Sequence, residues 1–192
     1  MSDTQYVQIK GLIEWAKVFE TNRDLKGPNG VFESHGGACT VDLLVDEENL
    51  KVLEDTNSQL PKNVRQKGAE ENGLFRVRFK RKWDAPYTYG GAPQVVHADG
   101  VTAWDIEEDG LIGNGSTGVV LASVYNAKGL WGTRLDGVQV IDPVEYDSGD
   151  DGDYTPKPRF QDHSKSAAPT PAKAKSKPAP KKKEDLEDEI PF

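Results

Sequence analysis

One stretch decides how the body of this chain folds: Phe75-Arg-Val-Arg-Phe-Lys-Arg-Lys-Trp83. Apolar residues recur at its odd positions, interrupted once by Arg81. The even positions hold only cations, namely Arg76, Arg78, Lys80 and Lys82. Alternation with period two predicts a β-strand that has one apolar face and one basic face. Cations on that face would lie roughly 6.5 to 7 Å apart.

The spacing of these cations is similar to that of successive phosphates in an extended single strand, so one strand face could follow one nucleic-acid backbone. The alternative is a solvated outer face, because lysines on an edge strand also discourage aggregation. The stretch contains no acidic residue, although the chain holds 32 acidic and 24 basic residues and has a net charge of −8. The local excess of cations favours polyanion binding by the strand, and the net negative charge argues against non-specific polyanion binding by the whole surface.

Aromatic residues follow the basic strand in Trp83-Asp-Ala-Pro-Tyr-Thr-Tyr89, ahead of a Gly90-Gly91 turn. Single-strand binders combine a cationic groove with rings on which bases stack. One of the three rings is expected in the core, with Trp83 the first choice. Further along the chain, a stacking ring and a phosphate contact are possible at Trp131 and Arg134, although a core position for Trp131 is left open. The candidate single-stranded DNA site therefore comprises Arg76, Arg78, Lys80, Lys82, Trp83, Tyr87, Tyr89, Trp131 and Arg134.

Apolar periodicity predicts the remaining elements of the body. A strand over residues 6–19, bent near Gly11, would place Val7, Ile9, Ile13 and Trp15 on the core side. Further strands are predicted over residues 38–45, 95–97, 119–125 and 130–141, with a bulge at Gly137. A helix is predicted from an N-cap at Asp46 to about residue 56, with Leu50 and Leu53 packing inward.

This element order predicts a mainly β fold: an OB-fold-like closed barrel with one or two short helices, long loops and a disordered C-terminal tail. We expect a binding domain over residues 1–145 and a disordered linker over residues 146–183, acidic at first and then rich in Lys, Pro and Ala. Within that linker, residues 164–183 contain seven lysines and no acid. Such composition cannot bury enough apolar surface to fold.

An acidic tip, residues 184–192, ends the chain with five carboxylates followed by Ile-Pro-Phe. A terminal ring can enter an apolar pocket while carboxylates meet Arg or Lys at its rim. A solubilising acidic tail is the alternative, and composition alone does not decide between them. The residues expected to bind a partner are Asp185, Glu187, Asp188, Glu189, Ile190, Pro191 and Phe192.

Other chemistry finds little support in the sequence. The acids of Trp104-Asp-Ile-Glu-Glu-Asp-Gly110 suggest a metal nuclease, but no matching His or Lys base accompanies them. The glycine-rich residues 112–118 lack the Gly-Lys-Ser/Thr of a phosphate loop. The three histidines have no metal-ligand spacing, and Cys39 is expected in the core. We therefore expect no cofactor, no metal and no catalysis.

Targeting signals are not found in the chain. It has no run of about 18 apolar residues, and its first residues lack the basic and apolar regions of a signal peptide. A single cysteine excludes an internal disulfide, which agrees with a reducing compartment. We expect a cytoplasmic protein that does not enter a membrane.

Two stretches carry a resemblance to known families. The acidic residues before Ile190-Pro-Phe192 resemble the tip of bacterial single-stranded DNA-binding proteins. The body resembles the phage replicative single-stranded DNA-binding proteins of the T7-type OB-fold family. That likeness lies in the Gly113-Asn-Gly-Ser116 turn before a valine-rich strand and in Leu135-Asp-Gly-Val-Gln-Val-Ile141. The ending departs from the T7-type pattern, and the bacterial N-terminal strand is absent.

The resemblance implies sequence-independent binding and protection of single-stranded DNA in phage DNA replication, recombination and repair, inside a bacterial host cell. It implies that the tip recruits DNA polymerase, helicase/primase or recombination enzymes, and that it competes with DNA for the basic groove. Self-association on DNA is possible. Two alternatives remain open: a metal-dependent nuclease that uses the acids of residues 105–109, and a protein-only adaptor that presents the tip.

Overall fold

A computed structural model describes residues 4–70, 72–85 and 89–145. The predictions made for Tyr87, for the linker and for the acidic tip lie outside these residues. The elements, in chain order, are β1 (Gln5–Lys17), β2 (Ala38–Val45), α1 (Glu47–Glu54), α2 (Leu60–Lys67), β3 (Phe75–Lys82), β4 (Gln94–Val96), β5 (Ser116–Ala127) and β6 (Leu130–Asp142). Every strand expected from the sequence is present, so the mainly β prediction is confirmed.

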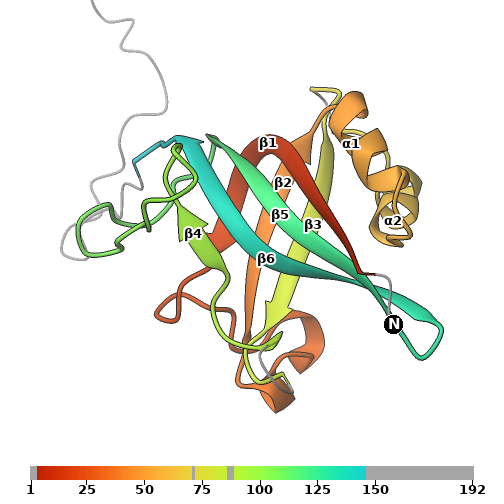
Figure 1. Ribbon diagram of the computed structural model, residues 1–192, viewed down its shortest axis with the longest axis horizontal. Coiled ribbons are helices and arrows are strands. Elements are labelled where there is room, and N and C mark those ends of the chain that lie inside the picture. The colour runs from red at the N-terminus through yellow and green to blue at the C-terminus, as the bar shows by residue number, and fades with distance from the viewer. Residues whose placement is uncertain (1–3, 71, 86–88, 146–192) are drawn as a thin grey trace, which may run out of the picture. The chain divides into compact units, whose positions relative to one another are not determined.

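The strands form one six-stranded sheet in the order β3-β2-β1-β5-β6-β4, antiparallel except where β4 joins β6 (Figure 1). Strand β1 changes partner near Gly11: its first part pairs with β5 and its last part with β2. A side chain at Gly11 would collide with the carbonyl oxygen of Leu44, which explains a glycine at the bend. One core cluster joins buried residues of β1, β2, β3, β5 and β6, so the sheet wraps around its apolar face.

Within the part of the chain that the structure describes, the strand pairing does not close the sheet into a barrel. In the described residues, β3 and β4 are the two edges of the sheet. Side-chain bonds nevertheless join β3 to β6, because Arg81 of β3 reaches the carbonyl oxygen of Leu135 in β6. The expected bulge in β6 lies beside Gly137, where the β5–β6 register shifts between the Leu121–Gly137 and Ala122–Leu135 pairs.

The two α-helices lie together, with α1 against β1 and α2 against β3 (Figure 1). The cap predicted for α1 is confirmed, since the carboxylate of Asp46 accepts a bond from the Asn49 backbone at 2.8 Å and Leu50 and Leu53 are buried. Helix α2 was not predicted, although Pro61 lies in its first turn and Gly68 follows its end. Each helix has eight residues, and no helix in the described ranges could cross a membrane.

The prediction that Trp15 faces the core is wrong, because its side chain is 60% exposed. The pairing of β1 with β2 shifts between Glu14 and Lys17, which breaks the alternation that the prediction assumed. Trp15 has a positive φ of 49°, and its backbone N–H donates to the side-chain oxygen of Asn114 at 2.7 Å. Val7, Ile9 and Ile13 of the same strand are buried as predicted.

Candidate nucleic-acid interface

The two-faced character predicted for β3 is confirmed. Val77 and Phe79 are at most 1% exposed and face the core. The four cations of the even positions lie on the opposite face, where β2 runs beside them: Arg76 pairs with Leu44, Arg78 with Asp42, Lys80 with Thr40 and Lys82 with Ala38. The β2 residues opposite the cations therefore differ along the strand, and so does the pairing of the cations with carboxylates.

The first half of the basic face is neutralised by acids from other segments. Arg78 donates to both carboxylate oxygens of Asp42, at 2.6 and 2.7 Å, and the side chain of Asp42 is only 2% exposed. Arg76 contacts Glu70, Glu14 and, at 3.6 Å, Asp42. Donating hydrogen bonds to Asp42 raises the pKa of Arg78, and donating to Glu70 and then to Glu14 raises the pKa of Arg76. The acids missing from the stretch itself are thus supplied by β1, by β2 and by the segment that precedes β3.

The second half of the basic face keeps its charge. Lys80 and Lys82 are exposed, and within residues 4–70, 72–85 and 89–145 no carboxylate lies within ion-pair distance of either. Lys82 Nζ lies 2.9 Å from His35 Nε2, so this ring nitrogen accepts the bond, because an ammonium group only donates. Lys80 lines a groove of about 510 Å³ between α2 and β3, together with Lys67.

Arg81 interrupts the apolar side of β3 because it connects β3 with β6 and with the loop that follows β3. Its guanidinium donates to the carbonyl oxygen of Gly90 at 2.9 Å and to Asp136 Oδ1 at 3.2 Å. The side chain is 12% exposed, and this burial, with the nearby charge of Arg134, lowers the pKa of the Arg81 guanidinium. The break in the alternation therefore marks a structural cation rather than a surface one.

Arg134 lies between two tyrosine rings. Its Cζ is 4.7 Å from the ring centroid of Tyr89 and 5.8 Å from that of Tyr125, and its Nε donates to Asp136 Oδ1 at 2.7 Å. With 19% of its side chain exposed, Arg134 orients these rings more than it offers a phosphate contact. Tyr125 was missed from the sequence. The feature that could have indicated Tyr125 is its position opposite Gly132, on the outward-facing side of the β5–β6 hairpin.

The two candidate tryptophans occupy different surroundings. Trp83 is half-buried beneath Arg23, whose Cζ lies 4.5 Å from the ring centroid, and it is not part of the core cluster, so the choice of Trp83 as the core ring is wrong. Arg23 is held by the carbonyl oxygens of Gly36 and Glu20. Trp131 is half-buried and packs against the core cluster.

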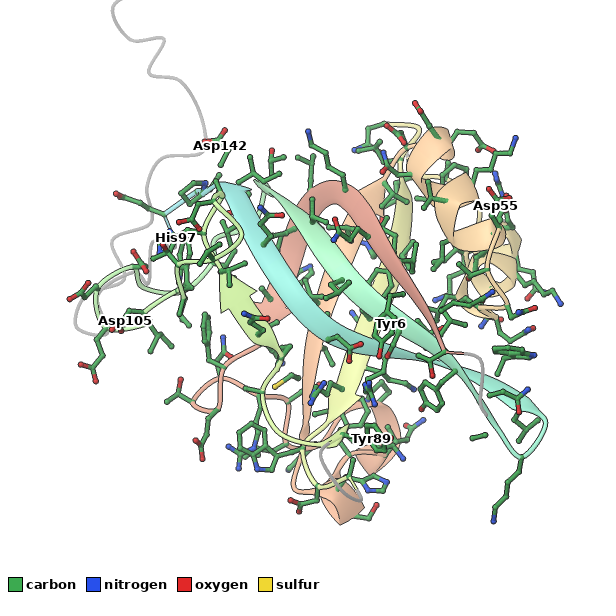
Figure 2. All side chains as sticks on the ribbon, viewed as in Figure 1. Tyr6, Asp55, Tyr89, His97, Asp105 and Asp142 are labelled. Carbon is green, nitrogen blue, oxygen red and sulfur yellow. The ribbon has the colours of Figure 1, made fainter. Side chains whose placement is uncertain are left out.

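The acidic loop after β4, which carries Asp105, lies apart from Tyr89 (Figure 2). The sequence showed no base for its acids, yet His97 Nε2 lies 2.9 Å from Asp109 Oδ2 and the His97 ring stacks on Trp104. The same Asp109 oxygen accepts the Asp105 backbone N–H, so it serves to fold the loop. In the described part of the chain, no three His, Cys, Asp or Glu side chains are grouped for a metal. Cys39 is buried, which raises the pKa of its thiol to about 11.

Comparisons with known proteins give a distant structural likeness. No family model matches the chain, and no curated protein matches its sequence. The single-stranded DNA-binding protein of bacteriophage Enc34 is similar in structure with a TM-score of 0.44 and 11% identity, covering 77% of this chain and 87% of that one. A C-terminal truncation of that phage protein gives a TM-score of 0.43 and 8% identity over 73% and 87%. No function is drawn from a likeness of this size.

Proposed function

We propose that this protein binds single-stranded DNA without sequence preference and without catalysis. The observation that carries the proposal is the exposed, cationic surface of the second half of β3. Lys80 and Lys82 are exposed and have no carboxylate partner among the described residues. Rings follow directly, with Trp83 half-buried and Tyr89 51% exposed. Cations beside accessible rings are the two components of single-strand recognition.

In this mechanism the two lysines neutralise phosphates and release counterions, so that affinity falls as salt rises. Bases stack on the faces of Trp83 and Tyr89, which every base can do because each has a π face. Trp131 and Arg134 support this surface from β6. Arg76 and Arg78 contribute less than their charge suggests, because carboxylates already occupy their donors.

The same proposal extends to architecture and to the tail. We place the binding domain at residues 1–145 as an OB-like barrel that Arg81 closes between β3 and β6. Residues 146–183 act as a linker, and the tip at residues 184–192 recruits replication, recombination or repair proteins. The five carboxylates of the tip are opposite in charge to Lys80 and Lys82, so the tip competes with DNA for these lysines.

The test is a titration of intrinsic tryptophan fluorescence with oligo-dT at low and high salt, without magnesium. The expected result is saturable quenching that weakens strongly with salt. The chain has four tryptophans, and Trp15 and Trp104 lie outside the proposed site, which provides matched controls. Trp83→Phe is expected to lose much of the quenching, whereas Trp15→Phe retains it. Absence of any quenching at low salt contradicts the proposal.

Omitting magnesium separates the proposal from the nuclease alternative, which predicts cleavage only after the metal is restored. Intact oligonucleotide after incubation with magnesium is the result expected here. An adaptor without a nucleic-acid site would leave the fluorescence unchanged at every salt concentration.

A further inference from the structure

Tyr89 and Tyr125 lie against Arg134, and Tyr6 lies in the same row of the sheet as Arg134. We call Tyr6, Tyr89 and Tyr125 the tyrosine cluster. Tyr6 comes from the start of β1, Tyr125 from β5 and Tyr89 from the loop after β3. Two of the three were not expected to bind anything. The cluster lies away from the acidic loop that carries His97 and Asp105 (Figure 2).

Strand register brings these residues together. Ser123 of β5 pairs with Tyr6 on one side and with Arg134 on the other, so these three form one row across β1, β5 and β6. Tyr125 lies two residues further along β5 and therefore points to the same face as Ser123. A diagonal neighbour in a sheet is within the reach of an aromatic side chain, so Tyr6 and Tyr125 line one surface.

Glycine at position 132 is what lets Tyr125 lie flat on this surface. Gly132 pairs with Tyr125, and a Cβ atom added to the glycine would come within 2.8 Å of the ring carbon Cζ. The ring of Tyr125 thus extends over the neighbouring strand towards Arg134. Arg134 is in turn held by Asp136, which leaves the guanidinium plane between the rings of Tyr89 and Tyr125.

The cluster is accessible and has a cationic base. Tyr6 is 69% exposed and Tyr89 51% exposed. Arg81 and Arg134 both contact the carboxylate of Asp136, and the guanidinium of Arg134 lies against the rings of Tyr89 and Tyr125. A surface with aromatic faces above and positive charge below suits a planar base that is joined to a phosphate.

Ser123 supplies an independent observation. Its side chain is fully buried in the row between Tyr6 and Arg134, and its hydroxyl oxygen has no hydrogen-bond partner among the described residues. Buried hydroxyl groups in proteins nearly always have a partner. The hydroxyl is closed to solvent in this arrangement, so a ligand could supply the missing bond only after a neighbouring side chain moves aside.

We infer that the tyrosine cluster is a stacking platform for a nucleobase, which makes Tyr6 and Tyr125 additional DNA-binding residues. This inference rests on the proposed function and specifies its strand path. The phosphates meet Lys80 and Lys82 at the end of β3, and the strand then passes over Arg134 to β5 and β1. The path leaves the neutralised half of β3 uncovered.

The experiment measures binding of labelled oligo-dT by fluorescence anisotropy with the full chain. Tyr6→Ala removes an exposed ring and is expected to weaken binding about tenfold, which is within the range for one stacked base. Tyr125→Leu is expected to have a similar effect. Trp15→Ala is the matched control, because it removes another exposed ring from the far part of β1 and is expected to leave affinity unchanged.

A second readout tests contact directly, and it does not depend on the stability of any variant. Ultraviolet crosslinking of the wild-type chain to a strand that contains 5-iodouracil, followed by peptide mapping, is expected to mark Tyr6 or Tyr125. One outcome overturns this inference and leaves the proposed function standing: the wild type binds DNA, Tyr6→Ala binds it with unchanged affinity, and neither tyrosine is crosslinked. No binding by the wild type overturns both.

Discussion

The two halves of the basic face of β3 carry two cations each but differ in what surrounds them. In the first half, Arg78 donates through Nε and Nη2 to the buried Asp42, and Arg76 is bound to Glu70 and Glu14. In the second half, the residues of β2 opposite Lys80 and Lys82 are Thr40 and Ala38, which bring no charge. A repeated pattern along one strand therefore produces a structural half and a half available to a ligand.

The difference shows that the charge of a strand face depends on its neighbouring strands as much as on its own residues. Asp42 lies 36 residues before Arg78 in the chain, and Glu14 lies 62 residues before Arg76. Paired donors cannot bind phosphate without first leaving their carboxylates, and a freed Asp42 would be a buried, unpaired charge. We therefore assign DNA binding to the second half and stability to the first.

The largest effect is expected from Lys80→Gln with Lys82→Gln. The double substitution removes both phosphate partners and should weaken oligo-dT binding at low salt about thirtyfold, or about 2 kcal/mol. Fluorescence anisotropy measures this change. Both side chains are exposed, so the melting temperature should stay at the wild-type value. Affinity equal to that of the wild type would remove the second half of β3 from the binding site.

A smaller effect, on stability instead of binding, is expected from Arg78→Ala. It leaves the buried carboxylate of Asp42 with only the longer contact to Arg76, so the free energy of unfolding should fall by about 1.5 kcal/mol. Urea denaturation measures it. Oligo-dT affinity should change by less than about threefold, because Arg78 is not a principal phosphate contact. A large loss of affinity with unchanged stability would reverse the assignment of the two halves.

The smallest effect is expected from Asp46→Ala, which lowers stability from a site unrelated to β3. Loss of the N-cap of α1 should cost about 1 kcal/mol of unfolding free energy, with DNA affinity unchanged. This variant shows whether a stability loss alone weakens binding. If it weakens DNA binding as much as the lysine substitutions do, the loss of affinity follows from lost stability. The two halves of β3 could then not be distinguished by their effects on binding.

The same variant has a pH signature. The bond from the Asn49 backbone lowers the pKa of Asp46 in the folded chain. Its contribution is therefore complete above the ordinary aspartate pKa, about 3.9, and is lost as pH falls through the lower folded value. Wild type and Asp46→Ala should differ in stability near neutral pH and converge in acid. A difference that persists in acid would contradict this origin.

Local patterns predicted much of the fold. Alternation located β3, a capping aspartate located the start of α1, and the glycine in β1 marked its bend, because each signal lies within a few neighbouring residues. Helix α2 was missed because its eight residues contain few apolar positions, with only Pro61 and Val64 buried. Trp15 was misplaced because a register shift reversed the alternation.

The candidate site was less predictable, because its character depends on pairing across the sheet. No signal within residues 75–83 shows that Asp42 faces Arg78, and none near Tyr125 shows that its ring lies against Arg134. Arg81 looked like an interruption of the strand, and its role becomes visible only through Asp136 and Gly90. The residues of the site were partly visible in the sequence, whereas their partners were not.

The salt dependence of oligo-dT affinity tests the central claim most directly, since its slope counts the phosphates that a protein neutralises. Each phosphate contact to a single strand contributes about 0.7 to the slope of log affinity against log salt. Lys80→Gln with Lys82→Gln should reduce the slope by about 1.4, whereas Arg76→Gln with Arg78→Gln should leave it near the wild-type value. An equal reduction in both variants, or a reduction only in the arginine variant, would contradict the division of β3 into a structural half and a binding half.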